Sequence, residues 1–288
     1  MTPAENVKAR MTPREPVPTG VVSRLTPVEG IRLVIFDIYG TLIISAAGDI
    51  SLVSESESAK GMAEAIRKLG GGGTDDEVET GLECYRAEIL RRQNDLRSQG
   101  VEFPEVEIRE VWKSIASQLK LPGERIESAA LAYECAVNPC WEMPGAGKVI
   151  RTLRKNSFPL GIISNAQFYT GAVVEGVSGI NLSGADFEPT LSVYSYREGF
   201  GKPSRQLFEK ALREAEALGI QSQEVLYIGN DLVKDIEPAV EVGFRTGLFA
   251  GDQRSLRTGS MTVEEACGKA DVVLTELIQL PEVLRLNE

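Results

Sequence analysis

The second half of the chain alternates short apolar runs with longer amphipathic segments, and this alternation limits the possible folds more than any other feature. From Pro144 onward the runs predict strands, and the segments between most of them predict helices. A strand, a helix and a further strand in this order form a right-handed crossover between parallel neighbours. The sequence therefore predicts an α/β fold built on a doubly wound parallel sheet. The predicted strands cover residues 160–164, 191–196, 225–229, 246–249 and 272–274, and the predicted helices cover residues 146–155, 204–218 and 232–241, with one more beginning near Phe168.

One more strand is predicted ahead of this region, where residues 31–36 form a continuous apolar run. A run without alternating polar residues is typical of a parallel strand that is buried on both faces. Between this strand and Pro144, the chain changes to helical periodicity, interrupted by breaks that are rich in Gly or contain Pro. We therefore expect an all-helical insertion within the sheet domain. Its predicted helices cover residues 58–69, 75–99, 105–119 and 124–136, and the apolar stripe Val106, Val111, Trp112, Ile115 and Leu119 is interpreted as core.

The sequence divides into three predicted parts. Residues 1–30 hold five prolines and scattered charges, and they lack the continuous apolar segment of a secretory signal. We expect them to form an N-terminal arm that is loose or wraps around the surface. Residues 31–47 and 144–288 form the predicted α/β core domain, and residues 48–143 form the predicted helical domain. A chain of 288 residues is long enough for one large core and a smaller second one.

The composition excludes several classes of function. A formal net charge of -11 would repel nucleic acid and anionic lipid, and no compact basic stripe offsets it. No segment approaches the roughly 18 apolar residues that a membrane span needs. We therefore expect a cytoplasmic protein that binds neither nucleic acid nor membrane, with its four cysteines reduced. The oligomeric state stays open.

The chain contains no histidine, and this restricts the chemistry that it can perform. Ser-His and Cys-His nucleophiles and every histidine acid–base mechanism are excluded. Any catalysis has to use carboxylates, lysine, tyrosine or a bound metal ion. The candidate groups stand at the ends of predicted strands, where open α/β sheets bind their ligands.

The first candidate is Asp37, in the segment Phe36-Asp37-Ile38-Tyr39-Gly40-Thr41-Leu42. A carboxylate can form a covalent intermediate with a phosphoryl group or an alkyl carbon, which divides one difficult displacement into two easier ones. Gly40 suits a sharp turn, and the hydroxyl of Thr41 can hydrogen-bond the loop or the nucleophile. An Asp after a strand can also simply cap a turn, so the remaining motifs decide between these interpretations.

Three further polar groups stand beside predicted strands and helices. Ser164 and Asn165 end the strand at residues 160–164, where a hydroxyl at the start of a helix suits phosphate oxygens or caps the helix. Lys202 lies between a Gly-rich segment and a Pro, and a fixed ammonium there would neutralise carboxylates and phosphate oxygens. Asp231 and Asp235 follow the strand at residues 225–229, four residues apart on one helix face. Together with Asp37 they form an oxygen-rich set of the kind that Mg²⁺ prefers.

Taken in order, these four segments resemble the four motifs of the haloacid dehalogenase superfamily of hydrolases, over residues 31 to about 274. The resemblance implies a Rossmann-like core and an inserted helical cap of the C1 type that closes over the site. It also implies a small-molecule substrate, a phosphorylated metabolite. The implied catalytic residues are Asp37 as nucleophile, Thr41 and Lys202, and the implied phosphate-binding residues are Ser164, Asn165 and Lys202. The implied Mg²⁺ site holds Asp37, the backbone carbonyl of Tyr39, Asp231 and Asp235. In this site, Asp235 is either a metal ligand or a residue that orders the ligand shell or Lys202.

Tyr39 and Asp231 favour different branches of this superfamily. Phosphatases carry a second Asp where this chain has Tyr39, whereas the dehalogenases resemble this chain in having Tyr there. Dehalogenases, however, replace the metal-binding acid that Asp231 matches, and they carry an Arg shortly after the first motif, which residues 42–66 lack. The match of Asp231 to the metal-binding acid favours the phosphatase branch more strongly than Tyr39 favours the dehalogenase branch.

The sequence therefore predicts a Mg²⁺-dependent phosphohydrolase that forms an aspartyl phosphate on Asp37. Because the usual acid–base Asp is missing, it would favour substrates with good leaving groups, such as acyl phosphates, or take a proton from the helical cap. Two alternatives stay open. One is a 2-haloacid dehalogenase that forms an alkyl ester on Asp37, and the other is a phosphate-ligand binding or regulatory protein that has lost catalysis.

Overall fold

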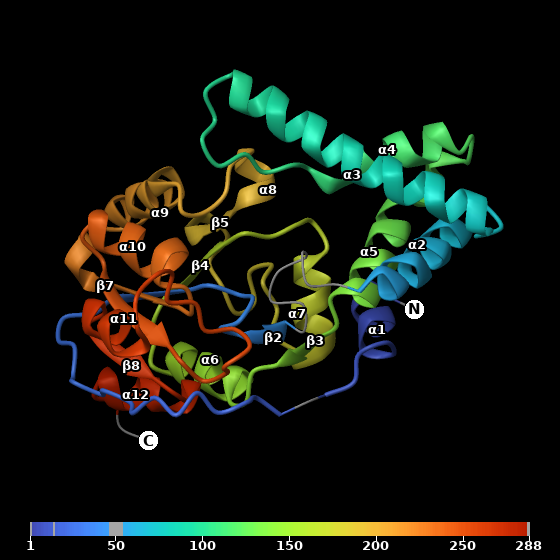
Figure 1. Ribbon diagram of the computed structural model, residues 1–288. Coiled ribbons are helices and arrows are strands. Elements are labelled where there is room, and N and C mark those ends of the chain that lie inside the picture. The colour runs from blue at the N-terminus through green and yellow to red at the C-terminus, as the bar shows by residue number, and fades with distance from the viewer. Residues whose placement is uncertain (1, 14, 46–53, 287–288) are drawn as a thin grey trace.

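The protein is described by a computed structural model over residues 2–13, 15–45 and 54–286. Its centre is a parallel sheet of six strands in the order β5–β4–β1–β6–β7–β8 (Figure 1). Helices cover both faces of this sheet, which confirms the predicted doubly wound α/β fold. The strands of the sheet are β1 (Leu33–Phe36), β4 (Leu160–Ser164), β5 (Ser192–Tyr194), β6 (Val225–Gly229), β7 (Arg245–Phe249) and β8 (Val272–Leu274).

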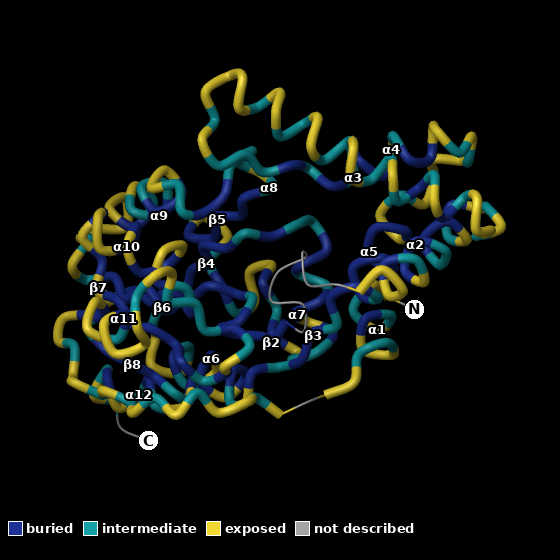
Figure 2. The backbone as a smooth tube through the Cα atoms, in the orientation of Figure 1, coloured by how far each residue is buried: buried dark blue, intermediate teal, exposed yellow. Residues whose placement is uncertain are grey.

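Strand β1 is buried on both faces, and Figure 2 shows the central strands as the most buried part of the chain. Val34 and Phe36 contact the core under α6 (Ala146–Lys155) and α12 (Leu280–Val283). Leu33 and Ile35 contact the core on the other face, under α9 (Arg205–Ala217) and α10 (Glu237–Glu241). Because both faces are covered, the strand shows no polar alternation in the sequence.

Strand β1 has β4 on one side and β6 on the other, and the register brings their carboxyl ends to one edge. Phe36 lies beside Ile162 of β4 and Ile228 of β6. The residues that follow these three strands therefore meet at one place, as the motif positions predicted. The segment after β6 differs from the single predicted helix over residues 232–241, because a π-helical turn (Leu232–Ile236) precedes α10.

The described part of the insertion between β2 (Ile43–Ser45) and β3 (Cys140–Glu142) holds four α-helices, which match the four predicted helices. Trp112 is completely buried and contacts the rings of Tyr85 and Tyr133, so the predicted apolar stripe is core. Strands β2 and β3 pair antiparallel where the chain enters and leaves the insertion. Both are only three residues long, too short for periodicity to indicate them. The helices are α2 (Glu55–Leu69), α3 (Asp75–Ser98), α4 (Ile108–Gln118) and α5 (Ile126–Val137).

The N-terminal arm wraps around the surface, one of the two forms expected for it. Its helix α1 (Pro3–Lys8) packs on α7 (Thr170–Ser178) and buries Val7 completely. Arg24 pairs with Val273 at the free edge of β8. Arg10 forms an ion pair with Glu64 of α2, so the arm contacts the insertion as well as the core. The predicted boundary near residue 47 lies outside the described residues, and the division into domains stays a prediction.

The remaining helices are α8 (Ser195–Glu198) and α11 (Val263–Lys269). All four cysteines are free thiols, as expected: Cys84, Cys135, Cys140 and Cys267. Within the described ranges, no helix is both long and apolar enough to cross a membrane.

Candidate active site

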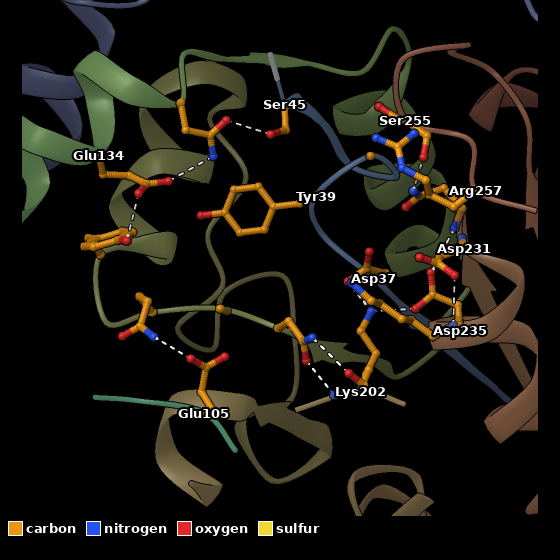
Figure 3. Close-up of a pocket in the computed structure, with 18 residues that line it drawn as sticks. Asp37, Tyr39, Ser45, Glu105, Glu134, Lys202, Asp231, Asp235, Ser255 and Arg257 are labelled. Carbon is orange, nitrogen blue, oxygen red and sulfur yellow. Dashed lines mark hydrogen bonds and ion pairs between the residues drawn. The ribbon is translucent and has the colours of Figure 1, made fainter. Parts of the chain in front are cut away.

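A cavity of about 420 Å³ opens at the carboxyl ends of β1, β4 and β6 (Figure 3). The core and the insertion both line it. Of the residues predicted from sequence, six line the cavity, whereas Thr41 and Ser164 lie behind its wall. The six are Asp37, Tyr39, Asn165, Lys202, Asp231 and Asp235.

Lys202 forms a buried cluster with Asp37 and Asp235 at the end of the cavity nearest the sheet. Its Nζ lies 2.7 Å from Asp37 Oδ1 and 2.5 Å from Asp235 Oδ1. Burial raises the pKa of Asp37 to about 6, although the Lys202 charge acts in the opposite direction. Burial also disfavours the ammonium of Lys202, but the two carboxylates outweigh this and raise its pKa above the ordinary value. A fixed positive charge therefore stands beside the candidate nucleophile.

The carboxylate of Asp235 is fully occupied by hydrogen bonds. Oδ1 accepts from Lys202 and from the hydroxyl of Tyr227 at 2.8 Å, and Oδ2 accepts from the backbone N–H groups of Asn230 and Asp231. Gly229 makes room for it, because a Cβ there would lie 2.5 Å from the carboxylate. These contacts fit Asp235 as a residue that orders Lys202 and the β6 loop, and they fit the role of direct metal ligand poorly.

Asn165 holds the backbone on both sides of the Lys202 side chain. Its Oδ1 accepts from the N–H of Lys202 at 2.7 Å, and its Nδ2 donates to the carbonyl of the same residue at 3.2 Å. A Cβ on Gly201 would lie 2.8 Å from the Asn165 amide, which explains the glycine before Lys202. Because both polar atoms of the amide are engaged, positioning Lys202 fits Asn165 better than binding phosphate.

The loop after β1 is locked to the loop after β6. Thr41 donates from its hydroxyl to Asn230 Oδ1 at 3.0 Å, and Asn230 Nδ2 donates to the carbonyl of Ser255. Gly40 has a φ of +91°, and a Cβ there would lie 2.6 Å from the Asn230 side chain. The hydroxyl of Thr41 therefore hydrogen-bonds the loop after β6, and not its own loop or the nucleophile as expected.

Ser164 is completely buried at the end of β4. Its hydroxyl donates to the carbonyl of Asn165 at 3.5 Å, the outer limit of a hydrogen bond. The structure therefore places it next to the cavity without bringing its side chain into the lining, and its role in phosphate binding stays a prediction.

Tyr39 points away from Asp37, toward the part of the cavity formed by the insertion (Figure 3). Its hydroxyl lies 3.1 Å from Oγ1 of Thr170. Burial raises the pKa of this phenol well above its ordinary value. The phenol therefore stays protonated near neutral pH and is directed away from the nucleophile, so it does not replace the missing acid–base Asp.

The cavity offers a donor set that fits Mg²⁺. Asp37 and Asp231 line it from the ends of the adjacent strands β1 and β6. Oδ1 of Asp231 accepts from the N–H groups of Val233 and Lys234, which holds the carboxylate in place. Across the described ranges, no three His, Cys, Asp or Glu side chains gather in a group able to hold a metal ion. Mg²⁺ needs fewer, because one or two carboxylates with waters complete its shell.

Two glutamates of the insertion line the other end of the cavity, Glu134 buried and Glu105 half-buried, and the sequence analysis identified neither. Glu134 accepts hydrogen bonds from Asn138 and Tyr169, and Glu105 accepts from Gln167 and Ser195. Glu134 carried a signal, since it is the one charged residue within residues 129–137. Glu105 follows a Pro in a loop, where nothing in the pattern distinguishes it. In contrast, Glu88 of α3 forms ion pairs with Arg91 and Arg92 of the same helix and does not line the cavity.

The sequence matches the haloacid dehalogenase-like hydrolase family over residues 31–243, and the chain belongs to this family of hydrolases. It is 26% identical over 216 residues to a hydrolase of Schizosaccharomyces pombe, covering 74% of this chain and 87% of that protein. It is 32% identical over 144 residues to the glyceraldehyde 3-phosphate phosphatase of Pyrococcus furiosus. This match covers 50% of this chain and 54% of that protein, so it spans about half of each. The fold resembles that of a 2-haloacid dehalogenase from Pseudomonas syringae, with a TM-score of 0.54 and 22% identity over 88% of this chain and 98% of the other.

Proposed function

We propose that this hydrolase is a Mg²⁺-dependent phosphohydrolase that acts on small phosphorylated substrates through Asp37. The observation that carries the proposal is the buried cluster of Lys202 with Asp37 and Asp235, next to the cavity-lining Asp231. At such a cluster, Lys202 and a bound Mg²⁺ would together supply the positive charge that the oxygens of a phosphate group need. The phosphatase name of the Pyrococcus furiosus relative supports the same class of substrate.

In the proposed reaction, an oxygen of Asp37 attacks phosphorus, and the bond from phosphorus to the leaving oxygen breaks. The resulting aspartyl phosphate is then attacked at phosphorus by water, which releases phosphate and restores Asp37. Lys202 neutralises charge beside the nucleophile in both steps. Mg²⁺ held by Asp37, Asp231 and the carbonyl of Tyr39 would supply further positive charge to the phosphate oxygens.

The leaving oxygen needs a proton when the leaving group is a simple alcohol. The phenol of Tyr39 is directed away from Asp37, so it does not provide this proton. The carboxylate of an acyl phosphate and the phenolate of an aryl phosphate can leave without a proton. We therefore expect acyl and aryl phosphates to be hydrolysed faster than alkyl phosphates.

The test is phosphate release from acetyl phosphate and p-nitrophenyl phosphate, with and without Mg²⁺. We expect turnover that requires both Mg²⁺ and Asp37, with the Asp37→Asn variant inactive. Full activity of an Asp231→Ala variant without metal would contradict the metal site. Any turnover that depends on Asp37 would also exclude a purely binding or regulatory role.

Dehalogenation is the second candidate, and Tyr39 is the feature that favours it. It would give halide release from 2-chloropropionate without metal. Water labelled with ¹⁸O separates the two reactions in a single turnover. Hydrolysis of an aspartyl phosphate at phosphorus leaves the label in phosphate, whereas hydrolysis of an alkyl ester at its carbonyl carbon leaves the label in the carboxylate of Asp37.

A further inference from the structure

The two ends of the cavity differ in charge. Among the described residues, the basic side chains that line it all belong to the core: Lys202, Lys234 and Arg257. The charged side chains that the described part of the insertion contributes are acidic, Glu105 and Glu134. Within the described part of the chain, the side-chain hydrogen-bond partners of both carboxyl groups are neutral: Asn138 and Tyr169 for Glu134, and Gln167 and Ser195 for Glu105. No basic side chain of these ranges therefore forms a hydrogen bond with either glutamate.

The hydrogen-bond donors to Glu134 are neutral, and burial raises the pKa of its carboxyl group above the ordinary value. A cation bound beside it would favour the ionised form. Glu134 lies in α5 and is only 8% exposed. Oε1 accepts from Asn138 Nδ2 at 2.9 Å, and Oε2 accepts from the hydroxyl of Tyr169 at 2.8 Å. Asn138 is oriented in turn by Ser45, whose hydroxyl donates to its Oδ1 at 2.6 Å. Hydrogen bonds to neutral groups offset only part of the cost of burying a charge, and a cationic ligand would offset more.

Glu105 is fixed in the same way, and its contacts tie the insertion to the core. Oε1 accepts from Gln167 Nε2 at 3.1 Å, and Oε2 accepts from the hydroxyl of Ser195 at 2.8 Å. The backbone around it pairs with the loop before Lys202, because Glu105 donates its N–H to the carbonyl of Gly199 at 3.0 Å. Figure 1 shows the segment between α3 and α4, to which Glu105 belongs, passing next to α8. The acidic end therefore has a defined place relative to Lys202.

We propose that the substrate's leaving group carries an ammonium group, which binds at Glu134 and Glu105 while the phosphate lies at Lys202, so that this protein acts on phosphorylated amines. The inference rests on the proposed phosphohydrolase function. The neighbouring donor groups already hydrogen-bond the two glutamates, so this end of the cavity offers a ligand mainly carboxyl oxygens, which are acceptors. An ammonium group is complementary to them, because it has three donors and a positive charge. The ring of Tyr39 points into the same space, and aromatic faces attract cations.

The test compares substrates that differ only in an amine and a hydroxyl: glucosamine 6-phosphate with glucose 6-phosphate, and 2-aminoethyl phosphate with 2-hydroxyethyl phosphate. Both members of each pair release a similar alcohol, so the slow release of this leaving group affects both kcat/KM values equally and cancels in their ratio. We expect the wild-type protein to prefer the amine by about tenfold or more. Equal or better turnover of the hydroxyl compounds would overturn the inference.

Variants of the glutamates locate the preference. Glu134→Gln keeps the size of the side chain and removes its charge, so it should lower kcat/KM for the amine about tenfold and leave the hydroxyl compound within about threefold. Glu105→Gln is the second variant, and melting curves verify that each folds. Glu127→Gln, on the exposed part of the same helix as Glu134, is the matched control and should change neither value. An unchanged preference in both Gln variants would overturn the assignment.

Two further readouts separate the amine inference from the phosphohydrolase proposal. Hydrolysis of p-nitrophenyl phosphate that requires Asp37, without a preference for the amine, leaves the function standing and overturns the inference. If no phosphate ester is hydrolysed, the proposed function fails and binding alone decides the inference. Glucosamine should then raise the melting temperature more than glucose does, and Glu134→Gln should abolish the difference; equal shifts would overturn cation recognition.

Discussion

The side-chain nitrogen of Lys202 lies 2.7 Å from Oδ1 of Asp37, and both groups are almost completely buried. The same nitrogen contacts Asp235, so one cation compensates two buried carboxylates. Removing it leaves two like charges next to each other without water. We therefore expect Lys202→Met to lower turnover by about a thousandfold or more and the free energy of unfolding by about 3–5 kcal/mol.

Urea unfolding and initial rates measure these two losses. Lys210→Met is the control, because Lys210 also forms a close ion pair, at 2.6 Å from Glu198, but its side chain is 42% exposed. We expect this variant to lose about 1 kcal/mol or less. Equal losses in the two variants would show that burial of the Lys202 cluster has no special effect.

A methyl group on Gly40 should disrupt the site, and Gly100 provides a matched control. The two glycines have φ values of +91° and +89°, so alanine strains the backbone equally at both. At Gly40 the new Cβ would also lie 2.6 Å from the Asn230 side chain, whereas at Gly100 nothing lies within 4 Å. We expect Gly40→Ala to lower kcat/KM by about a hundredfold and Gly100→Ala to leave it within about twofold. Similar activity of the two variants would contradict the lock between the β1 and β6 loops.

Stability should depend on pH through Asp37. Burial raises the pKa of Asp37 to about 6, from an ordinary value of 3.8. A raised carboxyl pKa means that protonation favours the folded state, so this group contributes stability below pH 3.8 and the contribution is lost as pH rises through about 6. Asp37→Asn resembles the protonated form. It should therefore be more stable than wild type at pH 8 by up to about 3 kcal/mol, and the difference should disappear near pH 4.

Activity should show the opposite dependence, because the nucleophile has to be ionised. We expect kcat/KM to rise with pH along an acid limb centred at or below about pH 6, since bound Mg²⁺ would favour the carboxylate. A pH–rate profile and urea titrations at acid and alkaline pH measure both effects. If the Asp37→Asn variant is less stable than wild type at pH 8, this would contradict the conclusion that burial raises the pKa of Asp37 in spite of Lys202.

The docking of the N-terminal arm depends on Gly176. A Cβ at this position of α7 would lie 2.6 Å from the carbonyl of Ala4 and 2.8 Å from Cβ of Val7. Gly171, in the same helix, has nothing within 4 Å. We expect Gly176→Ala to release α1 and to make the bond after Arg10 at least about tenfold more sensitive to trypsin, while Gly171→Ala stays like wild type. Equal proteolysis of all three proteins would show that α1 does not depend on this contact.

Much of the fold could be predicted because buried parallel strands are apolar over their whole length. Residues 160–164, 225–229 and 272–274 are strands with the predicted bounds. The meeting of Asp37, Lys202 and Asp231 at one edge could be predicted because these residues follow predicted strands. The pairing of β2 with β3 and the contact of Arg24 with β8 join residues far apart in sequence, so no local pattern indicated them.

The directions of side chains could not be predicted, and they decide the roles within the site. Tyr39 is two residues from Asp37, yet its phenol reaches Thr170 instead of the nucleophile. Asn165 follows the expected phosphate-binding serine, yet its amide holds the backbone of Lys202. Glu134 lines the cavity, where its carboxyl group accepts a hydrogen bond from Tyr169, 35 residues away in sequence. Each depends on packing between segments that the sequence does not place relative to one another.

Trapping the covalent intermediate tests the role of Asp37 most directly. The protein would be mixed with ³²P-labelled acetyl phosphate and Mg²⁺, quenched in acid within one turnover, digested, and its labelled peptide identified. We expect the label on the peptide that contains Asp37, in an amount that depends on Mg²⁺, and no label on the Asp37→Asn variant. Phosphate release without label on Asp37, or release by Asp37→Asn at the wild-type rate, would contradict nucleophilic catalysis by Asp37.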